Sequence, residues 1–330
     1  WRYGHGDEIG RLAQLMLSPA PLYNDLAVGP TNGTGHWVTG QDGVRIRIGV
    51  WNSGAKGTVL IFPGRTEYIE KYGGAARELS RHGYSSVAVD WRGQGLADRL
   101  QLDRNIGHVI NFTDYQYDVQ AMLRAADTLG LHKPYYLVAH SMGGCIALRA
   151  LMQKMPVQAS SFSAPMWGIA FNPPVKRVMA WGLSTLAHPF ALSETRAPGT
   201  SITAYVTTEP FATNSLTCDA PMFAQMKAHL EAVPDWALGG PSLRWLNEAL
   251  REMRHLHNRP SPDYPALCYL GSEENIVDPR RIHSRMARWP RGRLETMAQA
   301  KHEIMMERPE QRDVFYAQTS AFFDAHQPMA

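Results

Sequence analysis

The chain has 330 residues, of which 44% are apolar and 19% charged, a balance typical of a globular protein with one large domain or two smaller ones. Its net charge of +3 is too small to indicate a nucleic-acid partner. No apolar run reaches the length of a membrane-spanning helix and no secretory signal is visible, so we expect a cytoplasmic protein. Three widely spaced cysteines argue against a disulfide framework.

The first half of the chain predicts alternating strands and helices. Glycine and proline interrupt residues 1–35, which we expect to form an irregular N-terminal arm, and Asp42-Gly43 between two β-type runs indicates a hairpin. The continuous apolar run 58–62 is typical of a strand buried on both faces. Further strands are expected at 84–90, 135–139 and 157–163, and helices at 68–82, 114–129 and 142–154.

This alternation stops at Pro165 and resumes at Ala266. The residues between them contain no clear buried strand, but they show apolar helical patterns near 175–188, 221–233 and 241–257. Strands at 266–270 and 294–297 and helices at 280–288 and 309–323 follow. We therefore predict an α/β core, residues 36–164 and 266–330, with a mainly parallel sheet covered by helices on both faces, and a helical cap, residues 165–265.

A nucleophile is predicted where the 135–139 strand meets the following helix. The sequence Ala-His-Ser-Met-Gly at 139–143 matches the nucleophile elbow G-x-S-x-G, with Ala139 in place of the first glycine. A sharp turn of this kind presents the serine hydroxyl to a base, although it strains the serine backbone. The positive end of the next helix also points at the position where an oxyanion would form. Ser141 is therefore the predicted nucleophile.

The base and the acid are expected in loops that follow the late strands, since a serine nucleophile requires both. The loop after 294–297 contains His302, the predicted base. The loop after 266–270 contains Glu273, Glu274 and Asp278. Asp278 precedes a proline at an expected helix start and is interpreted as an N-cap. Glu274 is the preferred acid, and Glu273 is the alternative.

The oxyanion hole is expected from two backbone N–H groups, those of Met142 and of Arg65 in the loop after the 58–62 strand. Gly64 would let this loop approach the substrate closely. His302-Glu303 begins like a zinc-protease motif, but Met306 stands at the second histidine position, so we expect no metal. Residues 90–95 lack the third glycine of a dinucleotide fingerprint, so we expect no nucleotide cofactor either. Asp114 and Asp118, near a helix start, are interpreted as cap and dipole partners.

Five segments in this order resemble the bacterial lysophospholipase L2 and monoacylglycerol lipase group of α/β-hydrolase-fold serine hydrolases: FPGRTE at 62–67, DWRGQG at 90–95, AHSMGG at 139–144, GSEENIVD at 271–278 and HEI at 302–304. The similarity covers residues 36–323, loosely through the cap. Pro63-Gly64, where the group usually has His-Gly, and Glu274, where it usually has aspartate, resemble the lysophospholipase branch more. The resemblance implies a triad of Ser141, Glu274 and His302, and a cap over an acyl-chain pocket.

The resemblance thus implies an esterase that cleaves a lipid-like small molecule, most simply a lysophospholipid, through an acyl-enzyme. Monoacylglycerol lipase, carboxylesterase or thioesterase, acyltransferase and non-catalytic binding protein remain alternatives. Peripheral membrane contact is considered because arginines cluster at 280–293, although a solvated helix face and loop is the preferred interpretation of this cluster. Large apolar side chains of the cap suit an acyl pocket, and roughly half are expected only to pack: Met166, Trp167, Phe171, Met179, Trp181, Met222, Phe223, Met226, Trp236 and Trp245.

Overall fold

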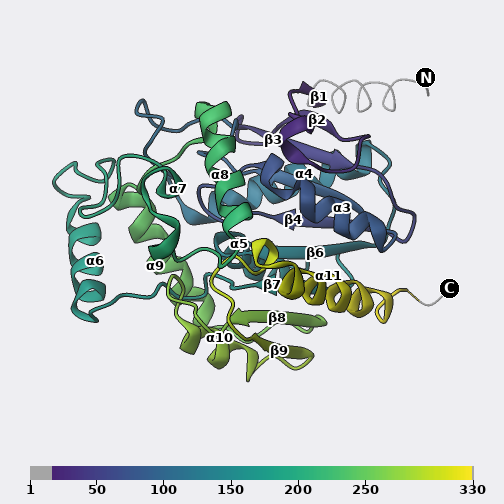
Figure 1. Cartoon of the computed structure of the whole chain (residues 1–330). Coiled ribbons are helices and arrows are strands. Elements are labelled where there is room, and N and C mark those ends of the chain that lie inside the picture. Colours follow the sequence, from purple (N-terminus) through teal and green to yellow (C-terminus); the bar gives the residue numbers. More distant parts are fainter. Residues whose placement is uncertain (1–16, 329–330) are drawn as a thin grey trace, which may run out of the picture.

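The computed structural model describes residues 17–328, which form one mixed sheet of nine strands in the order β1-β2-β3-β5-β4-β6-β7-β8-β9 (Figure 1). An antiparallel part contains β1 (Leu17–Ala20), β2 (Thr34–Thr39) and β3 (Arg45–Trp51). The other six strands are mutually parallel: β4 (Thr58–Phe62), β5 (Ser85–Asp90), β6 (Tyr135–His140), β7 (Ser160–Ser163), β8 (Ala266–Gly271) and β9 (Gly292–Met297). The predicted mainly parallel sheet is confirmed.

Helices cover both faces of this sheet, which explains why its central strands are apolar without alternation. Successive residues of β4 contribute to two separate cores: Leu60 and Phe62 to one, Val59 and Ile61 to the other. The first core includes residues of α4 (Tyr115–Thr128), α5 (Met142–Met152) and α10 (Pro279–Met286). The second includes residues of the short helix η1 (Ile69–Tyr72), α3 (Gly73–Arg81) and α11 (Pro309–Asp324).

The N-terminal segment differs from the expected irregular arm where the structure describes it. Residues 17–35 include β1, which pairs with β2 in the register Leu17 to Val38, and a short helix, α2 (Asn24–Ala27). Neither element shows a periodic pattern in the sequence, because a four-residue strand or helix is too short for one. Residues 1–16 of the expected arm lie outside the described residues.

Between β7 and β8 the chain adds no strand to the sheet in residues 165–265, all of which the structure describes. This segment contains α6 (Val175–Leu186), α7 (Tyr205–Thr208), α8 (Ala220–Ala232) and α9 (Leu243–His257), and it lies to one side of the sheet in Figure 1. α9 packs between α6 and the core helix α5, so α6 is the outer helix. The expected helices near 175–188, 221–233 and 241–257 are therefore present.

Two further observations concern the whole described chain. None of its helices combines the length and the apolar composition that crossing a bilayer requires. The three cysteines form no disulfide; Cys145 and Cys268 are buried as packing residues, and Cys218 is half-buried.

Candidate active site

Ser141 occupies a strained turn between β6 and α5. Its φ of 49° and ψ of −118° are rarely adopted by a residue with a side chain. The turn closes against the end of β4: a Cβ added at Gly143 would lie 2.1 Å from the carbonyl oxygen of Phe62, so only glycine fits there. The Ser141 N–H donates to the Ser163 carbonyl at 3.1 Å, which fixes the turn to β7. The backbone geometry expected of a nucleophile elbow is thus present.

Of the three candidate acids, Glu274 is the one that the structure places in contact with His302. The Nδ1–H of His302 donates to Oε2 of Glu274 at 2.7 Å, and both side chains are almost fully buried. The other oxygen of Glu274 accepts the N–H groups of Ile276 (2.7 Å) and Val277 (3.0 Å). By contrast, Glu273 is exposed, and Asp278 caps α10 as predicted.

The electrostatics of Glu274 match an ionised partner for the imidazole. Burial by itself would raise the pKa of this carboxyl group, but His302 and the two backbone N–H groups favour the carboxylate and lower the pKa below its ordinary value. Glu274 is therefore held ionised and oriented at neutral pH. It fixes the proton of His302 on Nδ1 and leaves Nε2 free to accept another.

Ser141 and His302 line the same cavity, whose volume is about 370 Å³. Of the ten large apolar residues named for an acyl pocket, four line it: Met166, Phe171, Met226 and Trp245. Others serve packing, among them Trp167, Phe223 and Trp236, which are buried outside the cavity wall, whereas Met179 is exposed. The mixture of lining and packing residues agrees with the expectation from composition.

Two backbone N–H groups near the elbow lack an acceptor. Neither Arg65 nor Met142 donates its N–H to any atom of residues 17–328. The loop that contains Arg65 is held on both sides: the N–H of Gly64 donates to the Glu67 carboxylate, and the Gln94 side chain donates to the Gly64 carbonyl at 2.8 Å. These fixed, unused donors are suited to an oxyanion.

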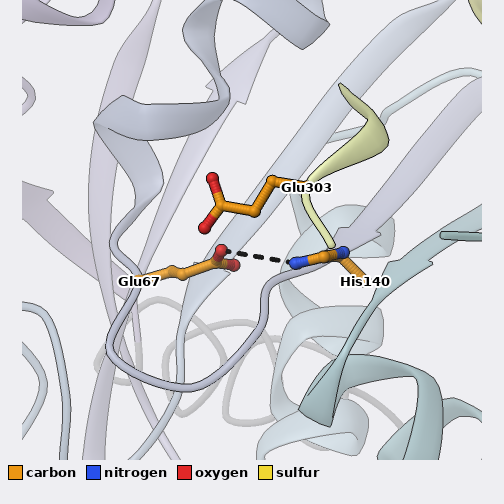
Figure 2. Close-up of side chains that lie close together, drawn as sticks. All are labelled: Glu67, His140 and Glu303. Atoms are coloured by element: carbon orange, nitrogen blue, oxygen red, sulfur yellow. Dashed lines mark ion pairs between the residues drawn. The ribbon is translucent and has the colours of Figure 1, made fainter. Parts of the chain in front are cut away.

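A buried polar cluster adjoins these residues and joins three loops (Figure 2). Lys71 donates to the carboxylates of Glu67 and Glu303, at 2.7 Å in both cases. Tyr72 donates to the second oxygen of Glu67 at 2.5 Å, and Nε2 of His140 lies 3.7 Å from the first. The cluster therefore connects the Arg65 loop, the elbow and the His302 loop. Sequence reasoning missed it, although the Glu67–Lys71 spacing of four residues was a visible signal.

Glu67, His140 and Glu303 also have the composition of a cation site, since their ligand atoms lie within 4.8 Å of one another (Figure 2). The ammonium group of Lys71 already supplies a positive charge to both carboxylates. Burial alone would raise the pKa of Glu67, but Lys71 and His140 lower it to about 2, whereas burial lowers the pKa of His140 to about 3. Lysine therefore takes the role that a metal ion would have here.

Two interpretations of charged residues need correction. Asp118 is not only a helix-dipole partner: it is buried and bonds the guanidinium of Arg92 at 2.8 and 2.9 Å, and burial raises its pKa to about 6. Arg285 does not belong to a solvated arginine surface, because it is buried and donates to the carbonyls of Leu256 and Arg259. Asp114 makes no side-chain cap bond at the start of α4; it accepts the N–H of Asn111 at 3.0 Å in the capping box of the short 3₁₀ helix that precedes α4.

Solved structures share this fold at low sequence identity. A soluble variant of monoglyceride lipase from Saccharomyces cerevisiae superimposes with a TM-score of 0.67 at 20% identity, covering 87% of this chain and 94% of that one. The monoacylglycerol lipase of Paleococcus ferrophilus gives a TM-score of 0.63 at 17% identity, covering 84% and 98%. These likenesses confirm the predicted α/β-hydrolase fold.

Relatives found by sequence are more nearly identical to this chain than these solved structures are. "Lysophospholipase L2" of Escherichia coli strain K12 is 31% identical over 281 residues, covering 81% of this chain and 80% of the relative. "Probable lysophospholipase L2" of Haemophilus influenzae is 26% identical over 258 residues, covering 78% and 80%. The family model described as "Serine aminopeptidase, S33" matches residues 53–309. The resemblance predicted from the motifs is confirmed, and the chain belongs to the S33 family of α/β-hydrolase-fold hydrolases.

Proposed function

We propose that the protein is a serine esterase that hydrolyses the fatty-acyl ester of a lysophospholipid. The bond between His302 and Glu274, beside Ser141 on an apolar cavity, is the observation that carries this proposal. An apolar cavity with a few polar groups at one end suits an acyl chain that ends in an ester. The relatives named lysophospholipase L2 support the choice of lipid.

In the proposed mechanism, Nε2 of His302 takes the proton of Ser141 as the serine oxygen attacks the ester carbonyl. The N–H groups of Arg65 and Met142 stabilise the oxyanion of the tetrahedral intermediate. His302 then returns the proton to the departing glycerol oxygen, which leaves an acyl group on Ser141. Water, deprotonated by His302, hydrolyses this acyl-enzyme, and Glu274 stays ionised throughout.

The proposal includes a role for residues 165–265 as a cap that shapes the acyl cavity and meets the lipid phase. The outer helix α6 and the turn after it expose a row of apolar side chains, among them Val178 (71% exposed), Leu186 (59%) and Phe190 (70%). Lys176 and Arg177 lie on the same helix, where they would favour an anionic surface. This surface is a better candidate for lipid contact than the arginines at 280–293.

The alternative activity in the family description, removal of an N-terminal amino acid, is less compatible with the cavity. A peptidase of that kind needs an uncompensated carboxylate to bind the substrate ammonium group. The cavity carboxylates Glu67 and Glu303 both bond the ammonium group of Lys71, and the cation of Arg65 in the same cavity disfavours a further cation. Monoacylglycerol lipase remains the second candidate, because a neutral lipid would fill the same apolar space.

The test is fatty-acid release from a lysophospholipid and from a monoacylglycerol with the same acyl chain, with Ser141→Ala as the blank. We expect a higher kcat/KM for the lysophospholipid and almost complete loss of both activities in the variant. Preference for the neutral lipid would reassign the enzyme to the lipases. Activity on neither lipid, or full activity of a folded Ser141→Ala protein, would contradict the proposal.

A further inference from the structure

The cavity beside Ser141 contains two cationic side chains whose environments differ. Lys71 has two carboxylate partners, Glu67 and Glu303, each at 2.7 Å. Arg65 has none, since no carboxylate of residues 17–328 lies within ion-pair distance of its guanidinium. The charge of Lys71 is therefore balanced within the protein, and the charge of Arg65 is not.

The guanidinium of Arg65 is held in place but incompletely bonded. Its Nη2 donates to the carbonyl of Gly239 at 2.7 Å, and its Cζ lies over the ring of Trp245, 5.1 Å from the ring centre. Its Nε is buried and has no hydrogen-bond partner among the described residues. Burial lowers the pKa of Arg65 to about 10, so the group remains a cation at neutral pH.

An arginine of this kind indicates an anionic ligand. Withdrawing a cation from water is costly unless an opposite charge replaces the lost hydration. A guanidinium that is already fixed by stacking and by one carbonyl bond loses little freedom when it binds, and its N–H groups match the oxygens of a phosphate. The ligand that enters this cavity is thus expected to bring the missing negative charge.

We propose that the Arg65 side chain is the subsite for the phosphodiester of the substrate head group. This inference rests on the proposed lysophospholipid esterase function. The backbone N–H of the same residue is a proposed oxyanion donor, so the guanidinium is one arginine side chain away from the reacting carbonyl. In a lysophospholipid the three-carbon glycerol unit separates the ester from the phosphate by a comparable span. One residue would therefore contact both ends of the glycerol unit.

Arg65 could instead serve only to connect the core to the 165–265 segment. Arg99 is an arginine that makes such a connection. Arg99 donates to the core carbonyls of Gly93 (2.6 Å) and Gly95 (3.0 Å) and to the carbonyl of Asp235 (2.9 Å) in that segment. It does not line the cavity. Arg99 is consequently the matched control for loss of an arginine bridge without loss of a phosphate subsite.

The first experiment compares the ratio of kcat/KM for lysophosphatidylglycerol to that for the monoacylglycerol with the same acyl chain. Arg65→Gln should lower this ratio about 10- to 100-fold, the loss typical of a charge-assisted hydrogen bond, and Arg65→Lys should restore part of it. Arg99→Gln should leave the ratio unchanged even if it weakens both activities. Equal losses on both lipids in Arg65→Gln would overturn the subsite, because they would indicate a purely structural arginine.

A second experiment does not require that the lysophospholipid be a substrate. Glycerophosphoglycerol, the head group without its acyl chain, should slow the labelling of Ser141 by a fluorophosphonate in the native enzyme but not in Arg65→Gln. This protection would support the subsite even if the enzyme preferred another lipid, so the two proposals fail separately. Equal protection in both proteins, or protection by inorganic phosphate alone, would overturn the assignment to a head group.

Discussion

In the sheet core, the buried cation of Arg47 contacts opposite charges of the protein itself. Arg47 bonds Glu70 and Asp90, each at 2.8 Å, and all three side chains are fully buried. Residues 165–265 present the reverse situation, since α6 exposes apolar side chains such as Val178 to solvent. In the proposals above, a lipid would meet two surfaces of the protein, the apolar face of α6 and the unpaired cation of Arg65. The charge of Arg47 is balanced without a ligand, whereas the charge of Arg65 has no carboxylate partner among the described residues.

The largest effect should come from the loop carboxylates that follow β8. Glu274→Gln removes the charge that orients His302, so kcat should fall by roughly 10²- to 10⁴-fold. Glu273→Gln alters the exposed side chain of the neighbouring residue in the same loop and should change kcat little. Steady-state ester hydrolysis measures both. A larger loss in Glu273→Gln would move the acid by one residue.

A substitution at Lys71 removes the cation that two buried carboxylates of the core share. Lys71→Met preserves the length of the side chain but leaves Glu67 and Glu303 buried without a cation, which should cost about 3–5 kcal/mol of unfolding free energy. The control is Lys56→Met, which removes a half-exposed pair with Asp324 and should cost less than about 1 kcal/mol. Urea unfolding of both variants gives the comparison. Similar small losses would show that the cluster is not under electrostatic constraint.

The pH dependence of protein stability tests the effect of burial on another ionisable residue, His140. Burial lowers its pKa to about 3 in the folded protein, whereas an imidazole in the unfolded chain titrates near 6.5. Between these values the unfolded chain binds the extra proton, so stability falls as the pH decreases from about 6.5, by at most about 1.4 kcal/mol per pH unit. His140→Asn keeps a donor for the Ser163 carbonyl and removes this dependence.

Thermal unfolding between pH 6.5 and 4.5 tests this expectation. The midpoint of native protein should fall more steeply than that of His140→Asn. The same substitution at exposed His188 controls for the simple loss of an imidazole. Parallel curves for all three proteins would mean that His140 is protonated in the folded state.

The smallest effect concerns the exposed face of α6. Val178→Glu should alter stability by less than about 0.5 kcal/mol, because the residue is mostly exposed, but it should weaken binding to vesicles about tenfold by removing one apolar contact. Sedimentation with ether-linked phosphatidylcholine and phosphatidylglycerol vesicles, in a Ser141→Ala background, measures this. Val314→Glu on α11 changes another exposed valine (44%), on a helix away from α6. Equal loss in both variants would exclude a specific role for α6.

Local sequence patterns predicted most of the fold because they reflect short-range geometry. Strand and helix periodicity located the β4–β9 framework and the helices α6, α8 and α9 to within a few residues, but not the four-residue α7. The serine turn was visible because only small residues fit around Ser141, and the structure shows the reason at Gly143. Elements of four residues, such as β1 and α2, carried too little periodicity to be predicted.

The candidate site was predictable in outline only. Spacing narrowed the acid to Glu273 or Glu274, but which of them reaches His302 depends on how the loop after β8 folds over the loop after β9. The catalytic roles of these residues stay predictions. The interpretations of Asp118 and Arg285 were incomplete because their partners lie 24 or more residues away in the chain.

The sequence by itself determined the order of most strands and helices, the turn at Ser141 and the loops that contain the candidate acid and base, because each depends on residues within a few positions of one another. Only the tertiary structure decided which charges are balanced. Lys71 meets Glu303, 232 residues along the chain, while Arg65 meets a backbone carbonyl of Gly239 and no carboxylate among the described residues. Charge pairing across such separations follows from the packing of loops on the sheet, which no local pattern encodes.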